Sequence, residues 1–270
     1  MLLKDKVVVI SGVGPGMGQA LARIAAQEGA KVVLGARNRA YLEEVRAGIE
    51  GQGGEALVAP CDISDPDQCR RLAEATAERF GGRIHGLVNS AYNHGEWGFV
   101  ENADEADWAK VFDVNCLGAL RMTKACLPYL KGGGAVANVS TMASVRPYGG
   151  AWGMEMAYAT AKGGLNVLTR YMATDLGRYG IRVNACRMGW IYGVSVKGFI
   201  ASQIAQGQRE EDVVASITKD IPLGIIPPED DCARAVLMMV SDYSAVVTGA
   251  ALDVNGGHWM APYATACATR

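Results

Sequence analysis

The chain has 270 residues, 50% of them hydrophobic and 20% charged, with a formal net charge of −2. This length and balance suit one α/β domain of ordinary size with a sizeable core. No basic face offsets a polyanion, which excludes a nucleic-acid partner. No apolar run reaches the ~18 residues of a membrane helix, which excludes a membrane partner.

Cysteine and histidine usage argues against disulfides and metal sites. The seven cysteines are scattered without a Cys-x-x-Cys pair, which favours reduced, mostly buried thiols in a cytoplasmic protein. The three histidines have no clustered ligand spacing, so we expect no metal. Strand-like residues at 7–10 leave no room for a signal peptide.

Strand and helix patterns alternate through the first third of the chain. Continuous apolar runs are typical of strands buried on both faces, and apolar residues at helical spacing predict the helices between them. The expected elements are a strand at 6–10, a helix at 17–28 closed by Gly29, a strand at 31–34, a helix ending near Gly51, a strand at 56–59, a helix starting at Pro66 and a strand at 84–88.

The alternation continues to the end of the chain. Asp104 is expected to cap a long helix reaching about Tyr129, with Asp107 placed for a capping box or the helix dipole. The later elements are strands at 135–139, 181–185 and 250–254, a helix that carries Tyr158 and Lys162 to about Gly177, and a helix at 228–240.

Repeated strand–helix units predict an α/β fold with a doubly wound, seven-stranded parallel sheet that has helices on both faces. No linker or repeat divides residues 1–270, so we expect a single dinucleotide-binding and catalytic domain. Residues 190–226 lack a clean period and are interpreted as a substrate lid. Residues 258–270 are expected to be a loose tail or an interface arm.

A glycine-rich turn follows the first predicted strand. Residues 11–18 read Ser-Gly-Val-Gly-Pro-Gly-Met-Gly. Glycine permits positive φ and removes the Cβ that would block a pyrophosphate, and the next helix points free N–H groups at the anion. The alternative is a tight turn without a ligand.

Tyr158 and Lys162 are four residues apart and therefore share one helix face. A free tyrosine has a pKa of about 10. A cation ~4 Å away, at an effective dielectric of ~20, is worth roughly 4 kcal/mol, an upper bound near three pKa units. We therefore expect Lys162 to lower the pKa of Tyr158 towards working pH. The alternative is a tyrosine packed in the core or at an interface.

In its ordered motifs the chain resembles the short-chain dehydrogenases/reductases, which implies a Rossmann-like fold, a nicotinamide cofactor and hydride transfer. Gly12, Gly16 and Gly18 fit the family's glycine turn, with Ser11 in place of threonine. The further matches are Asp62-Ile63, Asn89-Ser90-Ala91-Tyr92, Asn115, Asn138-Val139-Ser140-Thr141, Tyr158 with Lys162, and Asp253-Val254-Asn255-Gly256-Gly257.

The resemblance implies four catalytic residues. Tyr158 is the acid/base, and Lys162 supports it and binds the nicotinamide ribose. Thr141 takes the position of the catalytic serine that holds the substrate oxygen, with Ser140 as the alternative. Asn115 is expected to order a water that links Lys162 to solvent.

The resemblance also implies the cofactor site. Ala36 stands where an acidic residue would select NAD, and Arg37 follows it, so we favour NADP over NAD. The expected cofactor contacts are Gly12, Gly14, Gly16, Met17, Gly18, Arg37, Asn38, Asp62, Ile63, Asn89, Ala91, Tyr158, Lys162, Gly189 and Ile191. The family's Pro-Gly after the sixth strand is here Met188-Gly189, and the threonine that often follows is missing.

We expect an apolar, roomy substrate mouth built from the loop containing Tyr92, His94 and Trp97, the insertion at 143–155, and the 190–226 segment. His94 is interpreted as a loop residue rather than a second acid/base. The predicted substrate is a small hydrophobic ketone or secondary alcohol, and the resemblance implies a homo-oligomer, a tetramer or dimer. The alternatives are an NAD-dependent member, a non-redox enzyme of this fold such as a halohydrin dehalogenase, and a nucleotide-sensing binding protein.

Overall fold

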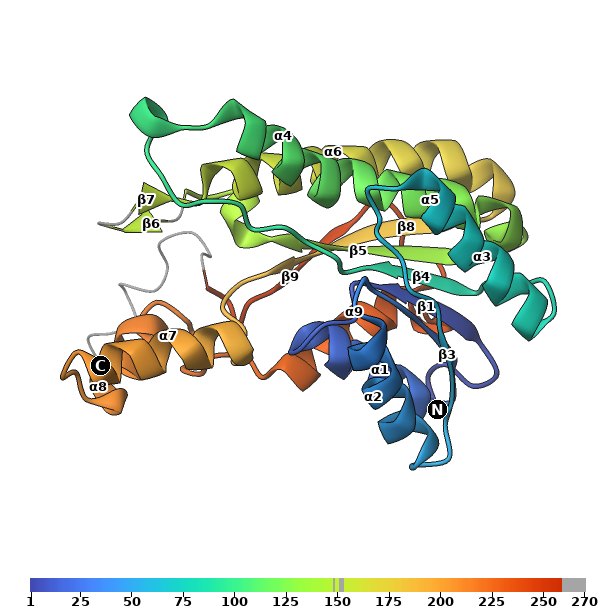
Figure 1. Cartoon of the computed structure of the whole chain (residues 1–270), viewed down its shortest axis with the longest axis horizontal. Coiled ribbons are helices and arrows are strands. Elements are labelled where there is room, and N and C mark those ends of the chain that lie inside the picture. The colour runs from blue at the N-terminus through green and yellow to red at the C-terminus, as the bar shows by residue number, and fades with distance from the viewer. Residues whose placement is uncertain (148, 151–152, 259–270) are drawn as a thin grey trace.

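The computed structural model describes residues 1–147, 149–150 and 153–258, and a parallel sheet of seven strands runs through its centre (Figure 1). Its strand order is β3-β2-β1-β4-β5-β8-β9. The strands are β1 (Val7–Ser11), β2 (Lys31–Gly35), β3 (Glu55–Val58), β4 (Gly86–Asn89), β5 (Ala135–Thr141), β8 (Arg182–Met188) and β9 (Ala251–Val254). The chain winds outward from β1 to one edge and from β4 to the other, which confirms the predicted fold.

Helices cover both faces of this sheet (Figure 1). One layer contains α1 (Met17–Gln27), α2 (Arg39–Glu50) and α9 (Glu229–Met239). The other contains α3 (Pro66–Phe80), α4 (Glu105–Phe112), α5 (Gly118–Leu130) and α6 (Met156–Leu176). Short 3₁₀ turns lie at Val100–Asn102, Met142–Ser144, Gly177–Tyr179 and Asp242–Ser244.

Strand β1 shows why the buried strands are apolar at every position. Val8 and Ile10 belong to the core beneath α1, α2 and α9. Val7 and Val9 belong to the core beneath α3, α5 and α6. Because successive side chains point to opposite faces of a sheet, a strand covered on both faces needs hydrophobic residues throughout.

The predicted helix starts follow from local chemistry. Asp65 caps α3 by accepting hydrogen bonds from the backbone N–H groups of Asp67 at 2.8 Å and Gln68 at 3.2 Å. Pro66 occupies the first helical turn, where its missing N–H costs nothing. At the end of α1, Gly29 adopts a positive φ of 88° and reverses the chain towards β2.

The long helix expected from Asp104 to about Tyr129 is interrupted. Asp104 does cap it, accepting from the Ala106 N–H at 2.9 Å. A π-helical turn at Asp113–Leu117 then separates α4 from α5. Asp107 does not form the expected capping box, because its carboxylate accepts from the backbone N–H of Glu96 at 3.1 Å in the loop after β4.

The segment at 190–226 contains two helices that sequence periodicity did not predict, α7 (Val194–Ala205) and α8 (Glu210–Thr218). Apolar residues lie on more than one face of α7, which hides the helical period. The segment has a small hydrophobic cluster of its own, formed by Val196, Ile200, Val213, Ile217, Ile221 and Ile226.

The 143–155 insertion contains a two-stranded antiparallel hairpin, β6 (Gly149–Gly150) and β7 (Gly153–Met154). Trp152 and the tail beyond 258 lie outside the described residues, so their expected roles are not assessed.

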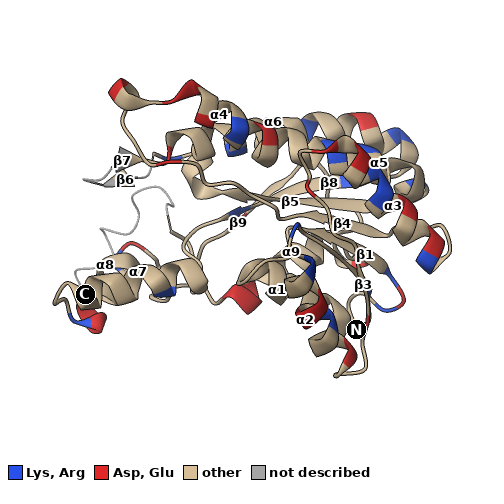
Figure 2. Ribbon diagram, in the orientation of Figure 1, with Lys and Arg blue, Asp and Glu red and all other residues tan. Residues whose placement is uncertain are grey.

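Charge is spread over the outer helices, with acidic and basic residues interspersed (Figure 2). Within the described ranges, no helix is long and apolar enough to cross a membrane, and no His, Cys, Asp and Glu side chains gather in a group of three suited to a metal ion. The cysteines described by the structure are buried free thiols, at positions 61, 69, 116, 126, 186 and 232.

Candidate active site

The candidate catalytic residues meet at the carboxyl end of the sheet, next to the point where the strand order reverses between β1 and β4. Tyr158 and Lys162 project from α6, and Thr141 ends β5. Helices α7 and α8 lie on one side of this edge and the β6–β7 hairpin lies on the other (Figure 1). Ligands of open α/β sheets bind at such a reversal point.

Lys162 is held rigidly inside the protein. Its side chain is 1% exposed, and its Nζ donates a hydrogen bond to the Val139 carbonyl oxygen at 2.7 Å. The same Nζ lies 5.9 Å from the centroid of the Tyr158 ring. The two side chains therefore share one face of α6, as their spacing predicts.

Burial dominates the ionisation of both groups. It lowers the pKa of Lys162 to about 7, against a small opposing effect of the Cys116 thiol. Burial also raises the pKa of Tyr158, followed by the Glu155 carboxylate and Tyr92, while a hydrogen bond with Thr141 acts in the opposite direction. The expected lowering of the Tyr158 pKa towards working pH is wrong, because burial disfavours the phenolate and raises this pKa instead.

The last two residues of β5 point to opposite sides. The Thr141 hydroxyl lies near the Tyr158 phenol and accepts from the backbone N–H of Ala143 at 3.2 Å. Ser140 is buried under α6, where its hydroxyl is 3.5 Å from the Lys162 carbonyl oxygen. The pleat of the strand therefore favours Thr141 as the hydroxyl that faces the substrate.

Asn115 ties the π-helical turn to the loop after β4. Its side-chain nitrogen donates to the carbonyl oxygens of Asn93 at 2.5 Å and Val111 at 2.9 Å. Its side-chain oxygen accepts from the Asn93 N–H at 3.3 Å. Since protein partners engage both ends of this buried amide, the geometry shows a bracing role for the side chain.

The glycine turn is shaped by close backbone contacts. Gly12 and Gly16 have positive φ values of 99° and 95°. A Cβ on Gly12 would lie 2.2 Å from the Ala91 nitrogen, and one on Gly18 would lie 2.2 Å from the Gly12 oxygen. A Cβ on Gly14 would meet only open space. The turn thus packs tightly against the end of β4 and is open at its middle.

Helix α1 begins directly after this turn. It starts at Met17, and no side chain caps its N-terminal N–H groups. Uncapped N–H groups and the positive end of the helix dipole favour an anion at this position. The open middle of the turn and the free helix terminus fit the diphosphate of a dinucleotide.

Asn89 and Ile63 face away from the turn. The Asn89 side chain donates to the Asn138 side-chain oxygen at 2.9 Å and to the Thr123 hydroxyl at 3.3 Å, joining β4 to β5 and α5. Ile63 is buried against Gly118. The side-chain nitrogen of Asn89 is therefore engaged by protein partners, and the Ile63 side chain is engaged in packing.

The Asp62 carboxylate interacts with Ser64 and with the positive charge of Arg37. Its carboxylate accepts from the Ser64 N–H at 2.9 Å and the Ser64 hydroxyl at 2.7 Å. These bonds lower the pKa of Asp62, and the positive charge of Arg37 adds to the effect. The Asp62 carboxylate and the Arg37 guanidinium are thus near enough to interact at the end of β2.

The two residues after Ala36 behave differently. Asn38 caps α2 by accepting from the Tyr41 N–H at 3.2 Å, so its side chain is engaged with the protein. Arg37 is exposed and forms no ion pair in the part of the chain that the structure describes. Arg39, in contrast, pairs with Glu43 at 3.4 Å.

After β8, Gly189 is required by packing, since a Cβ there would lie 2.7 Å from the Asn255 Cβ. Ile191 packs against the core under α1 and α9, and its carbonyl oxygen accepts from the Gly193 N–H at 2.7 Å. This tight turn leads into α7 and keeps the start of α7 beside the glycine turn.

Sequence reasoning missed Glu229, the first residue of α9. One of its carboxylate oxygens is buried without a hydrogen-bond partner, 3.5 Å from the Cβ position of Gly16 and 2.8 Å from that of Gly193. The only signal was an acidic residue after Pro228. A negative charge here opposes an anion at the turn, so a diphosphate bound there would need the Glu229 side chain to rotate away.

Sequence reasoning also missed Glu155 and the contact between the rings of His94 and Tyr158. His94 lies in the loop after β4, as expected, but its ring stacks on Tyr158 with centroids 5.0 Å apart. The His94 Nε2 is 2.9 Å from a carboxylate oxygen of Glu155, the residue that precedes α6. Tyr92 meets the Tyr158 ring edge-on at 6.2 Å.

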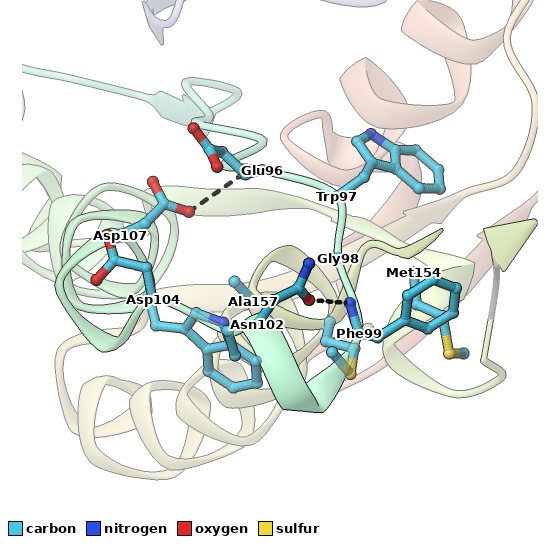
Figure 3. Close-up of a pocket in the computed structure, with 12 residues that line it drawn as sticks. Glu96, Trp97, Gly98, Phe99, Asn102, Asp104, Asp107, Met154 and Ala157 are labelled. Atoms are coloured by element: carbon cyan, nitrogen blue, oxygen red, sulfur yellow. Dashed lines mark hydrogen bonds between the residues drawn. The ribbon is translucent and has the colours of Figure 1, made fainter. Parts of the chain in front are cut away.

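A small cavity of about 70 Å³ lies beside this group, between the 96–104 loop, α4 and β7 (Figure 3). Trp97, Phe99, Trp108, Met154 and Met156 contribute to its lining. The close-up shows Asp107 directed at the backbone of Glu96 and Asn102 at that of Phe99. Ligand pockets measure ~300–1,000 Å³, so this space alone is too small to hold a substrate.

Comparison with known proteins shows similarity along nearly the whole chain. A sequence profile described as enoyl-(acyl carrier protein) reductase matches residues 12–258. The 2-(S)-hydroxypropyl-CoM dehydrogenase 3 of Xanthobacter autotrophicus is 33% identical, over 94% of this chain and 97% of its own length. Trans-4-hydroxycyclohexanecarboxylate dehydrogenase of Sinomonas cyclohexanicum is 33% identical, over 94% and 92%. The crystal structure of levodione reductase, 30% identical, matches with a TM-score of 0.84 over 94% and 98%.

Two glycines of the turn are expected to respond differently to alanine. Gly12→Ala forces a Cβ into the backbone of Ala91 at a positive φ, so we expect a loss of at least about 2 kcal/mol in the free energy of unfolding. Gly14→Ala, which meets open space, should stay within about 0.5 kcal/mol of the native chain. Denaturant titrations measure both, and equal losses would contradict the packing described for this turn.

The buried Lys162 predicts a distinctive pH dependence of stability. The penalty for burying its charge is fully present below pH 7 and disappears as the pH rises through 10.5, its ordinary pKa. The native chain should therefore gain roughly 5 kcal/mol over this window relative to Lys162→Met, whose side chain does not titrate. Unfolding measured at several pH values tests this. Parallel stability profiles for the two proteins would show that the pKa of Lys162 is not lowered.

Proposed function

Because the chain belongs to the short-chain dehydrogenase/reductase family, whose members use NAD or NADP, we propose that it is an NADP(H)-dependent oxidoreductase that interconverts a hydrophobic ketone and the corresponding secondary alcohol. One observation carries the proposal. The Tyr158 phenol, near the Thr141 hydroxyl and next to Lys162, stands at the carboxyl edge of the sheet that also holds the open glycine turn. This arrangement suits proton transfer beside a bound dinucleotide.

The chain's own residues would hold the cofactor as follows. The glycine turn and the N-terminus of α1 bind the diphosphate, and Arg37 binds a 2′-phosphate. Lys162 binds the nicotinamide ribose, in keeping with the family resemblance. When bound, the nicotinamide supplies or takes up the hydride.

The protein supplies the proton. In ketone reduction the carbonyl carbon gains a C–H bond, and its oxygen gains the proton of the Tyr158 hydroxyl, which leaves a phenolate on the protein. Thr141 holds the same oxygen in place. Because a tyrosine is protonated at neutral pH, Tyr158 would enter ketone reduction as the general acid.

The preference for NADP rests on the end of β2. Ala36 carries no charge that would repel a 2′-phosphate, and Arg37 is exposed and free of ion pairs within the described part of the chain. A charge-assisted hydrogen bond from Arg37 would add to the affinity for the phosphorylated cofactor.

A hydrophobic substrate is supported by the residues around Tyr158. Tyr92 is 58% exposed beside the Tyr158 ring, and Tyr192 and Val194 at the start of the lid, residues 190–226, are also exposed. One relative is named as a dehydrogenase of trans-4-hydroxycyclohexanecarboxylate, which contains a cyclic secondary alcohol. An apolar secondary alcohol or its ketone fits these surroundings.

Self-association is proposed through the layer formed by α4, α5 and α6. Exposed hydrophobic side chains are concentrated there, namely Phe112, Leu117, Leu120, Val167 and Tyr171. Apolar patches of this kind on a monomer mark interaction surfaces. The layer would allow a homodimer or homotetramer in which the catalytic edge of each sheet stays open.

Replacing Tyr158 tests the catalytic proposal. Tyr158→Phe removes the proton donor and should reduce turnover with NADPH and a panel of ketones by about 10²–10⁴-fold. NADPH binding, followed by cofactor fluorescence, should persist. Thr141→Val should also lose activity, whereas Ser140→Ala, its neighbour on the opposite face of β5, should keep most of it. Native-like turnover in Tyr158→Phe would rule out the acid/base role.

Replacing Arg37 tests the cofactor preference. Arg37→Asp substitutes repulsion for attraction at a 2′-phosphate and should shift the NADP-to-NAD affinity ratio by about ten- to a hundredfold towards NAD. Arg39→Asp is the matched control, because Arg39 pairs with Glu43. Thermal shifts with each cofactor measure the ratio. If it is unchanged in Arg37→Asp, Arg37 does not read the phosphate.

A further inference from the structure

Three helices begin around the glycine turn, and one carboxylate is buried among their first residues. Gly16 is the N-cap of α1 and Gly193 is the N-cap of α7, and neither helix has a side-chain cap. A carboxylate oxygen of Glu229, the first residue of α9, lies 3.5 Å from the Cβ position of Gly16 and 2.8 Å from that of Gly193. The carboxylate therefore fills the space between two uncapped helix ends.

This carboxylate differs from its neighbours on α9. Its buried oxygen has no hydrogen-bond partner among the residues that the structure describes. The next two residues are both paired, Asp230 with Arg23 at 2.5 Å and Asp231 with Arg234 at 2.6 Å. Burying a carboxylate without a bonded partner is costly, but the positive ends of the nearby helix dipoles favour a negative charge at this position. The Glu229 carboxylate thus takes the place that a bound anion would take.

The backbone around Glu229 is fastened on both sides. The Tyr192 N–H donates to the Pro227 carbonyl oxygen at 2.8 Å, which holds the start of α7 against the start of α9. The ion pair of Arg23 with Asp230 joins α1 to α9. The Glu229 side chain can instead change its rotamer, which clears the space without moving a helix.

We propose that Glu229 is a gate on the cofactor site, whose carboxylate occupies the diphosphate position in the free protein and rotates out when a dinucleotide enters. The proposal rests on the function proposed above, in its assignment of the diphosphate to the glycine turn. Because a carboxylate and a diphosphate repel each other, the cofactor binds molecules in which the gate is open. The apparent dissociation constant is then the intrinsic one divided by the open fraction. Glu229 thereby sets the cofactor affinity of the chain.

Removing the charge is the first test. Glu229→Gln keeps the length of the side chain and removes the repulsion, so we expect the full chain to bind NADPH about tenfold more tightly, as for a gate open in about one molecule in ten. Cofactor fluorescence measures the dissociation constant. Asp231→Asn is the matched control, because it removes the same charge from a side chain that is paired with Arg234. Its affinity should stay within about twofold of the native value.

The sign of the change separates a gate from a structural role. If Glu229 only supported the start of α9, its replacement would loosen that helix end and leave NADPH binding equal or weaker. An affinity of Glu229→Gln at or below the native value would therefore overturn the proposal.

Gly193 offers a way to open the gate without changing the charge. Its φ of −116° suits any residue, and an added Cβ would meet only the flexible end of Glu229 within 3 Å. Gly193→Ala should therefore displace the carboxylate and tighten NADPH binding. In the Glu229→Ala background there is no carboxylate to displace, so the effect of Gly193→Ala on affinity should be smaller there by about fivefold or more. Equal effects in the two backgrounds would mean that the carboxylate does not stand between the cofactor and the turn.

Inorganic pyrophosphate separates the gate from the proposed enzymatic function. It carries the diphosphate alone, so its binding requires neither nicotinamide recognition nor turnover. Pyrophosphate should raise the melting temperature of Glu229→Gln at concentrations that leave the native chain and Asp231→Asn unchanged. If no variant binds NADPH, the proposed function fails, while this difference still supports the gate. If pyrophosphate stabilises the native chain and Glu229→Gln equally, the carboxylate does not compete with an anion and the gate is wrong.

Discussion

The burial of two ionisable side chains on one face of α6 is the constraint on which the site depends. Lys162 is buried next to β5, where its Nζ donates a hydrogen bond to the Val139 carbonyl oxygen. Tyr158 lies one helical turn away on α6. Burial penalises the ammonium and the phenolate alike, so each neutral form is favoured. In the resting protein, a neutral Tyr158 phenol therefore lies beside a Lys162 side chain that loses its proton readily.

The sheet brings the parts of the site into register. Because β1, β4 and β5 are parallel neighbours, the glycine turn, the loop containing Ala91 and the Thr141 hydroxyl all emerge at one edge. The contact of Gly12 with Ala91 locks the first two of these together. Asn115 fastens the loop after β4 to the π-helical turn, which places His94 against Tyr158. Packing between distant segments thus determines what surrounds the phenol.

The local motifs could be predicted from the sequence because their residues interact within one helix, strand or turn. The apolar runs of the strands, the Asp65 and Asp104 caps, the Gly29 reversal and the Tyr158–Lys162 spacing each depend on neighbours a few positions away. The two helices in the 190–226 segment were not predicted, since apolar residues lie all around α7 and hide the helical period. The π-helical turn at Asp113–Leu117 was also missed, because no local pattern distinguishes it from a continuous helix.

From its residue order alone, the chain specified a doubly wound α/β fold, a glycine-rich turn after the first strand and a tyrosine–lysine pair on one helix face, because backbone geometry and short spacings encode these features. Folding decided the rest. The pleat of β5 directs Thr141 rather than Ser140 at the phenol, and the depth of burial raises the pKa of Tyr158, which its spacing from Lys162 was expected to lower. Long-range contacts brought Glu229 to the glycine turn and Glu155 to His94. Desolvation and contacts between remote segments exist only in three dimensions, so no local pattern could reveal them.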